Sequence, residues 1–357
     1  MTSEAFALEG SMMTNPPANR DSGIPAEAPS ATHPSTAPPR IMACVDTSAM
    51  GRKVMAHAAA ITQALDGELT LIRVIETQPA GGSPPDPVEW EIHRRETWEA
   101  MLQIVAAQDI APARIQAQVI EGEPGEQIAL WARDHDVDLT VLCTQGEDQA
   151  TTGSHGNTAR SVIAHAIGSV LLVPDGVADG GPVAYRKILV PLDGSCRAES
   201  AVPMAVRLAR AREGEIVFVH VVPVPELTEI GPPETEAREL SDTLVRRNER
   251  VAREYLDRTR SHLADQGIHA RSLVLRGGDV RRRLARAIVD EAADLVVLSS
   301  HGRSGYVDVP HGSTAAYQID HPTTPLLIVR PRTARSQRHP VPAPTCARHR
   351  VSDQASP

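Results

Sequence analysis

Aromatic residues are scarce in this chain of 357 residues, at 3% of the sequence, although hydrophobic residues make up 41%. Its hydrophobic cores must therefore be built from Ala, Val, Leu and Ile. That composition suits α/β layers, because buried parallel strands are unbroken aliphatic runs. A single core rarely extends beyond about 250–300 residues, so the length predicts two domains.

The chain also lacks long apolar runs, paired cysteines and an excess of basic residues. No apolar run approaches the roughly 20 residues of a membrane helix, and the N-terminus lacks the pattern of a secretory signal. The net charge of −9 argues against nucleic acid as the main partner. Scattered thiols without a CxxC pair favour a reducing cytoplasm over a disulfide framework. The four cysteines are Cys44, Cys143, Cys196 and Cys346. We therefore expect a cytoplasmic protein with no membrane partner.

Between two tails, the chain repeats itself. The tails, residues 1–38 and 334–357, are rich in Pro, Ala, Ser and Thr without hydrophobic period, which predicts a disordered leader and tail. RIMACVDTSAMGRKVMAHAAAITQALDGELTLIRVIE, from Arg40, matches KILVPLDGSCRAESAVPMAVRLARAREGEIVFVHVVP, from Lys187. Matching residues near the start of the two copies lie 147 residues apart, whereas matching residues near their ends lie 156 residues apart. The second copy has therefore gained nine residues, which the prolines after its second strand lead us to expect in a longer loop.

Each copy alternates strands and helices, β-α-β-α-β-α-β-α-β, which predicts a parallel sheet with helices on both faces. The segment DGVADGGP has the Gly, Asp and Pro content of a linker. We expect a first domain over residues 39–175, a linker over 176–185 and a second domain over 186–333.

The segment with the most chemical content is SSHGRSGYVDVPHGST, Ser299–Thr314. It follows the aliphatic strand Leu295–Leu298 and ends where a helix is expected to begin. A strand, a Gly-bearing loop and a helix start make an anion site, because unpaired amides and the helix dipole favour negative charge. Ser313 and Thr314 can add hydroxyl donors to that site, or they can simply cap the helix.

These residues resemble the ATP-binding signature of the universal stress protein family, G-x-x-G, nine residues, then G-[S/T]. Gly302, the nine residues Arg303–His311, and Gly312-Ser313 reproduce its last three elements, whereas Ser299 replaces its first Gly. The VPLDGS turn and the VHVV strand end also resemble that family. The resemblance covers roughly residues 39–332.

The resemblance implies two tandem Rossmann-like domains, similar to adenine nucleotide alpha hydrolases, each with five strands in the order 3-2-1-4-5. A ligand would lie where that order reverses, beyond the carboxyl ends of the first and fourth strands. The ligand implied is ATP, with or without Mg²⁺. Asp193 and Val221 would contact the adenosine part, and Gly312–Thr314 would hold the phosphates. The full implied set is Pro191, Asp193, Val221, Leu298, Ser299, His301, Gly302, Gly312, Ser313 and Thr314.

The first copy departs further from the signature. Cys143 stands at the first Gly, Gln145 replaces a His, and Asn157 replaces the Ser. Because Asn can still donate and cap, the site is weakened and not excluded. The corresponding residues are Asp46, Val74, Gly146, Gly156, Asn157 and Thr158. We therefore expect an ATP-binding stress-response regulator or sensor that holds nucleotide chiefly in its second copy.

Two other functions stay open. One is slow ATP hydrolysis or adenylyl transfer, for which Asp193 is the only obvious metal-holding carboxylate. The other is a nucleotide-free interaction module, because the resemblance suggests an internal pseudo-dimer that pairs the last strands, residues 170–173 and 326–329, and a homo-oligomer.

Two smaller features have alternative interpretations. Cys143 is either redox-sensitive or a buried inert thiol. An arginine cluster at a predicted helix start is either a phosphate patch or a solvated helix face. Its members are Arg281, Arg282, Arg283 and Arg286.

Overall fold

The computed structural model describes residues 37–46, 48–76, 86–106, 114–144, 156–177, 182–225, 234–301 and 311–330. The predicted leader, apart from residues 37–38, and the predicted tail lie outside these ranges. So do residues 302–310 and 145–155, which include Gly302 and Gly146.

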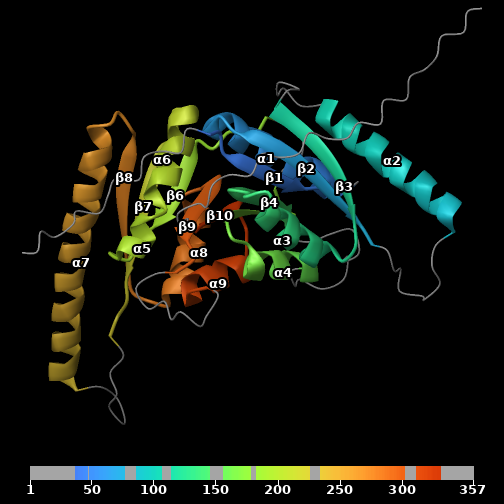
Figure 1. Cartoon of the computed structure of the whole chain (residues 1–357). Helices are drawn as coiled ribbons and strands as arrows, with labels where there is room; N and C mark the ends of the chain where they lie inside the picture. Colours follow the sequence, from blue (N-terminus) through green and yellow to red (C-terminus); the bar gives the residue numbers. More distant parts are fainter. Residues whose placement is uncertain are drawn as a thin grey trace, which may run out of the picture. The chain divides into compact units, whose positions relative to one another are not determined.

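Strands and helices alternate in both copies of the repeat (Figure 1). The first half contains β1 (Arg40–Cys44), α1 (Ala49–Leu65), β2 (Glu68–Ile75), α2 (Pro87–Ala106), β3 (Ile115–Glu121), α3 (Pro124–Asp134), β4 (Leu139–Cys143), α4 (Asn157–His165) and β5 (Ser169–Val173). The second half contains β6 (Lys187–Pro191), α5 (Cys196–Glu199), α6 (Val202–Ala211), β7 (Glu215–Val222), α7 (Thr235–Ala264), β8 (Ala270–Arg276), α8 (Val280–Asp290), β9 (Leu295–Ser299), α9 (Ser313–Asp320) and β10 (Leu326–Val329).

All these strands form one 10-stranded sheet in the order β3-β2-β1-β4-β5-β10-β9-β6-β7-β8. Strands within each half are parallel and follow the order 3-2-1-4-5, so the predicted α/β fold class is confirmed. The two halves meet where β5 and β10 pair antiparallel, with Leu171 opposite Leu327. The expected pairing of the last strands is therefore found inside one chain.

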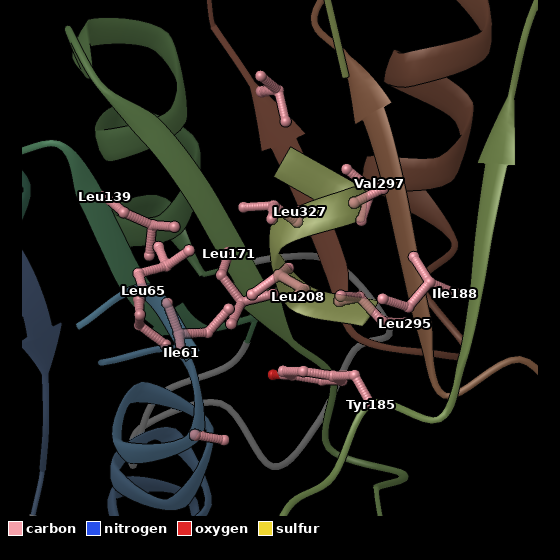
Figure 2. Close-up of a cluster of buried hydrophobic side chains, with 14 of the residues drawn as sticks. Ile61, Leu65, Leu139, Leu171, Tyr185, Ile188, Leu208, Leu295, Val297 and Leu327 are labelled. Carbon is pink, nitrogen blue, oxygen red and sulfur yellow. The ribbon is translucent and has the colours of Figure 1, made fainter. Parts of the chain in front are cut away.

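Aliphatic side chains cover both faces of this sheet, as the scarcity of aromatic residues led us to expect. Helices α1, α2, α6 and α7 pack on one face, and α3, α4, α8 and α9 pack on the other. On the first face the core is continuous across the β5–β10 junction. Figure 2 shows Ile61 and Leu65 from α1 close to Leu171 of β5 and Leu208 of α6. The halves therefore share one hydrophobic core.

The predicted linker is not wholly a solvated connection. Tyr185, at its end, is 3% exposed, and its hydroxyl lies 2.7 Å from Nδ1 of His57 on α1. His57 is equally buried, at 3% exposed. Burying two polar side chains is tolerated because each satisfies the other's hydrogen-bonding group. The linker therefore ends in the core that joins the two halves.

The extra residues of the second copy do not lengthen a loop, so that expectation is wrong. They lengthen a helix: α7 has 30 residues, whereas its counterpart α2 has 20. A second difference affects the first helix, which is continuous in α1 but divided into α5 and α6. Pro203, which stands where the first copy has Ala56, lies at the start of α6. Proline has no N–H for the helical ladder and is tolerated at a helix start, which accounts for the division.

Candidate nucleotide site

The first wall of the candidate site is the turn after β6. Oδ1 of Asp193 accepts hydrogen bonds from the backbone N of Ser195 at 3.0 Å and from its Oγ at 2.6 Å. Oγ of Ser195 in turn accepts from the N of Ala198, which caps α5. This Asx-type turn fixes the Asp193 carboxylate at the carboxyl end of β6. The same bonds recur after β1, from Ser48 to Asp46.

The second wall is the start of α9. Gly312 is the N-cap, with φ −65° and ψ 156°, and its N–H donates to the carbonyl of Ser300 at 2.9 Å. Among the described residues, no side chain caps this helix. Within the described residues, Ser313 and Thr314 therefore do not serve as the cap, and the first amides of α9 have no acceptor inside their own helix. The positive end of the helix dipole favours an anion there.

The third wall is the end of β9, where Ser299 replaces the first glycine of the family signature. Ser299 is not among the residues with positive φ, so serine brings no left-handed strain at this position. Its Oγ donates to the carbonyl of His301 at 2.6 Å and supports the turn that follows the strand. The substitution is thus compatible with the local backbone.

These three walls enclose one cavity of about 130 Å³, several times the space that a single water needs. Most of the predicted residues of the second copy line it: Pro191, Asp193, Val221, Leu298, Ser299, Gly312, Ser313 and Thr314. His301 is not among the lining residues; its Nδ1 lies 3.1 Å from Oγ of Ser300. Gly302 lies outside the described residues. The structure therefore brings together residues of β6, β7, β9 and α9 that are distant in sequence.

The cavity also has lining residues that the sequence did not identify as part of the site. They are Leu192, Ala198, Val219, Val280, Leu284 and Ala315, whereas His220, which also lines the cavity, was expected beside the adenine. Val280 and Leu284 come from α8, four residues apart on one helix face. Periodicity marks that face as apolar, but it does not tell a cavity wall from a core contact. His220 is held by a 2.7 Å contact between its Nδ1 and the carbonyl of Leu192.

His311 directly precedes Gly312, the N-cap of α9. Burial, the positive charge of Arg330 and the nearby His301 lower the pKa of His311 to about 4. The imidazole is therefore neutral at physiological pH. Its Nε2 lies 3.3 Å from Nη2 of Arg330, which can only donate, so Nε2 is the acceptor.

The first half places its matching residues at the same edge of the sheet. Asp46 follows β1, Val74 lies near the end of β2, and Gly156 is the N-cap of α4, followed by Asn157 and Thr158. The amide of Gly156 donates to the carbonyl of Thr144 at 3.0 Å, as Gly312 does to Ser300. The scaffold of the site is thus kept, although Gly146 lies outside the described residues.

The two halves differ, however, at the turn after the first strand. A β-carbon on Gly51 would lie 2.0 Å from the backbone oxygen of Asp46. The counterpart of Gly51 is Ala198, whose β-carbon is accommodated and which lines the cavity of the second half. The turn of the first half therefore lies closer to its helix.

Three of the four arginines at the start of α8 lie on a solvated helix face, whereas Arg283 is half-buried. Arg281, Arg282 and Arg286 are exposed, and the guanidinium of Arg281 pairs with Asp279 at 2.7 Å. Asp279 also caps the helix by accepting from the amides of Arg281 and Arg282. The hydrogen bond from Arg281, together with these amides, lowers the pKa of Asp279 to about 2. The carboxylate thus offsets the unfavourable position of cations at a helix N-terminus.

Neither a metal cluster nor a membrane span is found in the part of the chain that the structure describes. There, no three His, Cys, Asp or Glu residues gather as metal ligands would. No helix within the same ranges is long and apolar enough to cross a membrane.

Comparisons with known proteins agree with this architecture. The model of the universal stress protein family matches residues 39–174 and 184–330. A universal stress protein of Mycolicibacterium smegmatis is 27% identical over 304 residues, covering 82% of this chain and 97% of that protein. Another, from Mycobacterium tuberculosis, is 24% identical over 303 residues, covering 81% and 96%. The crystal structure of a universal stress protein from Archaeoglobus fulgidus shares the fold, with a TM-score of 0.55 at 16% identity over 82% of this chain and 98% of that one.

Proposed function

Because this chain belongs to the universal stress protein family, we propose that it is a stress-response regulator or sensor that binds ATP in its second half. One observation carries the proposal. One cavity at the switch point between β6 and β9 brings the carboxylate of Asp193 together with the start of α9, which no side chain caps among the described residues. Ligands of open α/β sheets bind at this kind of position.

The cavity has the two chemical ends that a nucleotide needs. Val219, Val221, Val280 and Leu284 make one part apolar, which suits the faces of an adenine ring. Asp193 is an acceptor for hydroxyl groups such as those of ribose. At the other end, the amides and hydroxyls of Ser313 and Thr314 are donors for phosphate oxygens.

Preference for the second half rests on differences between the two copies. The first half has Cys143 and Asn157 where the second has Ser299 and Ser313. Its turn after β1 also lies against α1, since Gly51 leaves no room for a β-carbon. The thiol of Cys143 is a weaker donor than the hydroxyl of Ser299. Asn157 keeps a donor but is a larger side chain than Ser313, and the turn after β1 leaves less space beside α1.

Calorimetric titration of the intact protein with ATP tests the proposal. We expect binding by the natural protein, its loss in Gly312→Asp, and its retention in the matched variant Gly156→Asp. A carboxylate at either N-cap would occupy the place of a phosphate, so the pair of variants reports which half is used. Absence of ATP binding in the natural protein, or undiminished binding in Gly312→Asp, would contradict it.

Two further kinds of experiment define the ligand. Titrations with ADP, AMP and GTP compare the phosphate chain and the base, and titrations with Mg²⁺ or with EDTA show whether the ion contributes. Native mass spectrometry of the freshly purified protein identifies any nucleotide that it retains from the cell.

A further inference from the structure

Arg330, directly after β10, reaches from the second half into the first. Its guanidinium donates to the carbonyl oxygens of Ile163 and Ala166, at the C-terminal end of α4. Its backbone N also lies 3.4 Å from Oγ of Ser169. The last carbonyls of a helix lack intrahelical partners and carry the negative end of its dipole, so a guanidinium is well placed there.

The same guanidinium holds the residue that precedes the phosphate-binding turn. Nη2 of Arg330 donates to Nε2 of His311 at 3.3 Å, and His311 is bonded covalently to Gly312. The turn is thereby fixed at two points, because the amide of Gly312 also donates to the carbonyl of Ser300. Arg330 is half-buried, and this burial lowers the pKa of its guanidinium.

Among the described residues, this connection has no counterpart in the first copy. Pro174 occupies in the first copy the position that Arg330 has in the second, and proline carries no side-chain donor. The helix that Arg330 holds, α4, itself begins at the candidate loop of the first half. One side chain thus joins α4 of the first half to the phosphate turn of the second.

We infer that Arg330 is a positioning residue for nucleotide binding in the second half: by anchoring His311 to the end of α4, it sets the turn Gly312–Thr314. The phosphate turn of the second half consequently depends on how α4 of the first half is docked. The first half then contributes to ATP binding even when it holds no nucleotide. This inference rests on the proposed function.

Arg330→Gln in the full chain tests the inference, with Arg160→Gln as the matched control. Arg160, on α4, also pairs across the halves, with Asp320 of α9 at 4.0 Å, but both side chains are more than half exposed. An exposed pair of this kind contributes little, so we expect less than about a twofold change in ATP affinity. Arg330→Gln should weaken ATP binding about tenfold. Arg330→Lys keeps the positive charge but loses the planar guanidinium group. Its ATP affinity should therefore lie between those of Arg330→Gln and Arg160→Gln.

A second measurement does not require ATP. In nucleotide-free protein, NMR should show the pKa of His311 rising toward its ordinary value in Arg330→Gln, and the amide signals of Gly312 and Ser313 shifting. Arg160→Gln should leave both unchanged. Unchanged amide signals in Arg330→Gln would overturn the inference, as would unchanged ATP affinity in a protein that binds ATP. If the natural protein binds no ATP while the signals shift as expected, the proposed function and the nucleotide-binding part of the inference fail, whereas the part that Arg330 sets the turn Gly312–Thr314 is supported.

The variant His311→Asn distinguishes an effect on the position of the turn from a general loss of folding. It leaves the contacts between Arg330 and α4 in place and removes only the link to the turn. We expect it to weaken ATP binding while the urea midpoint stays that of the natural protein. A stable His311→Asn variant with unchanged ATP affinity would overturn the inference.

Discussion

The backbone oxygen of Asp46 approaches Gly51 so closely that a β-carbon there would be 2.0 Å away from it. No heavy atoms pack at that distance, so either the turn after β1 or the start of α1 would have to move. Gly51→Ala should therefore lower the free energy of unfolding by about 2–3 kcal/mol, as overpacking does elsewhere. Urea unfolding measures this change. Gly176→Ala, where no heavy atom lies within 4 Å of the added carbon, should be neutral, and equal effects of the two variants would contradict the explanation.

The junction between the halves should be sensitive to a buried charge. Ile328 lies in β10 opposite Val170 of β5 and is fully buried, so a lysine there would lose its hydration without gaining a partner. We expect Ile328→Lys to reduce the free energy of unfolding by about 4 kcal/mol. Val289→Lys makes the same kind of change at a position 55% exposed and should cost about 0.5 kcal/mol or less. A small loss in Ile328→Lys would show that the pairing contributes little.

Stability should fall in mild acid because of His57. Burial lowers its pKa to about 4, against about 6.5 in an unfolded chain. Between these values the unfolded chain binds the extra proton, so the contribution of neutral His57 is complete above pH 6.5 and is lost as the pH falls toward 4. Between pH 7 and 4.5 we expect a loss of about 2–3 kcal/mol attributable to this residue.

Urea unfolding of the natural protein and of His57→Gln at both pH values isolates that loss. Glutamine can still bond the hydroxyl of Tyr185 but does not titrate in this range. The variant should therefore lose about 2–3 kcal/mol less on acidification than the natural protein does. The same pH dependence in both proteins would show that other groups dominate.

Gly312→Asp should separate stability from binding. The φ and ψ of Gly312 are accessible to any residue. Aspartate is also a better N-cap than glycine, by a few tenths of a kcal/mol. The melting temperature should therefore stay the same or rise slightly while ATP binding is lost. Differential scanning fluorimetry with and without ATP measures both, and a lowered melting temperature without ATP would mean that the variant acts through folding.

The candidate site of the second half was largely predictable, because local sequence patterns mark many of its residues. Aliphatic runs locate β6, β7 and β9, and the residues that follow parallel strands gather at one edge of the sheet. Gly312 was identified in this way, whereas Asp193 and Val221 were implied by the resemblance to the universal stress protein family; all three line one cavity. Val280 and Leu284 were missed, because an apolar helix face looks the same in sequence whether it borders a cavity or a core.

The sequence by itself determined the fold class, because the alternation of strands and helices in each copy is a local pattern. Its resemblance to the universal stress protein signature supplied the strand order and the position of the better-kept loop. Tertiary structure alone decided the rest. It placed the extra residues in α7, brought Tyr185 of the linker into the shared core beside His57, and set Arg330 against α4 and His311. These features are contacts between segments far apart in the chain, and packing across the β5–β10 junction selects them.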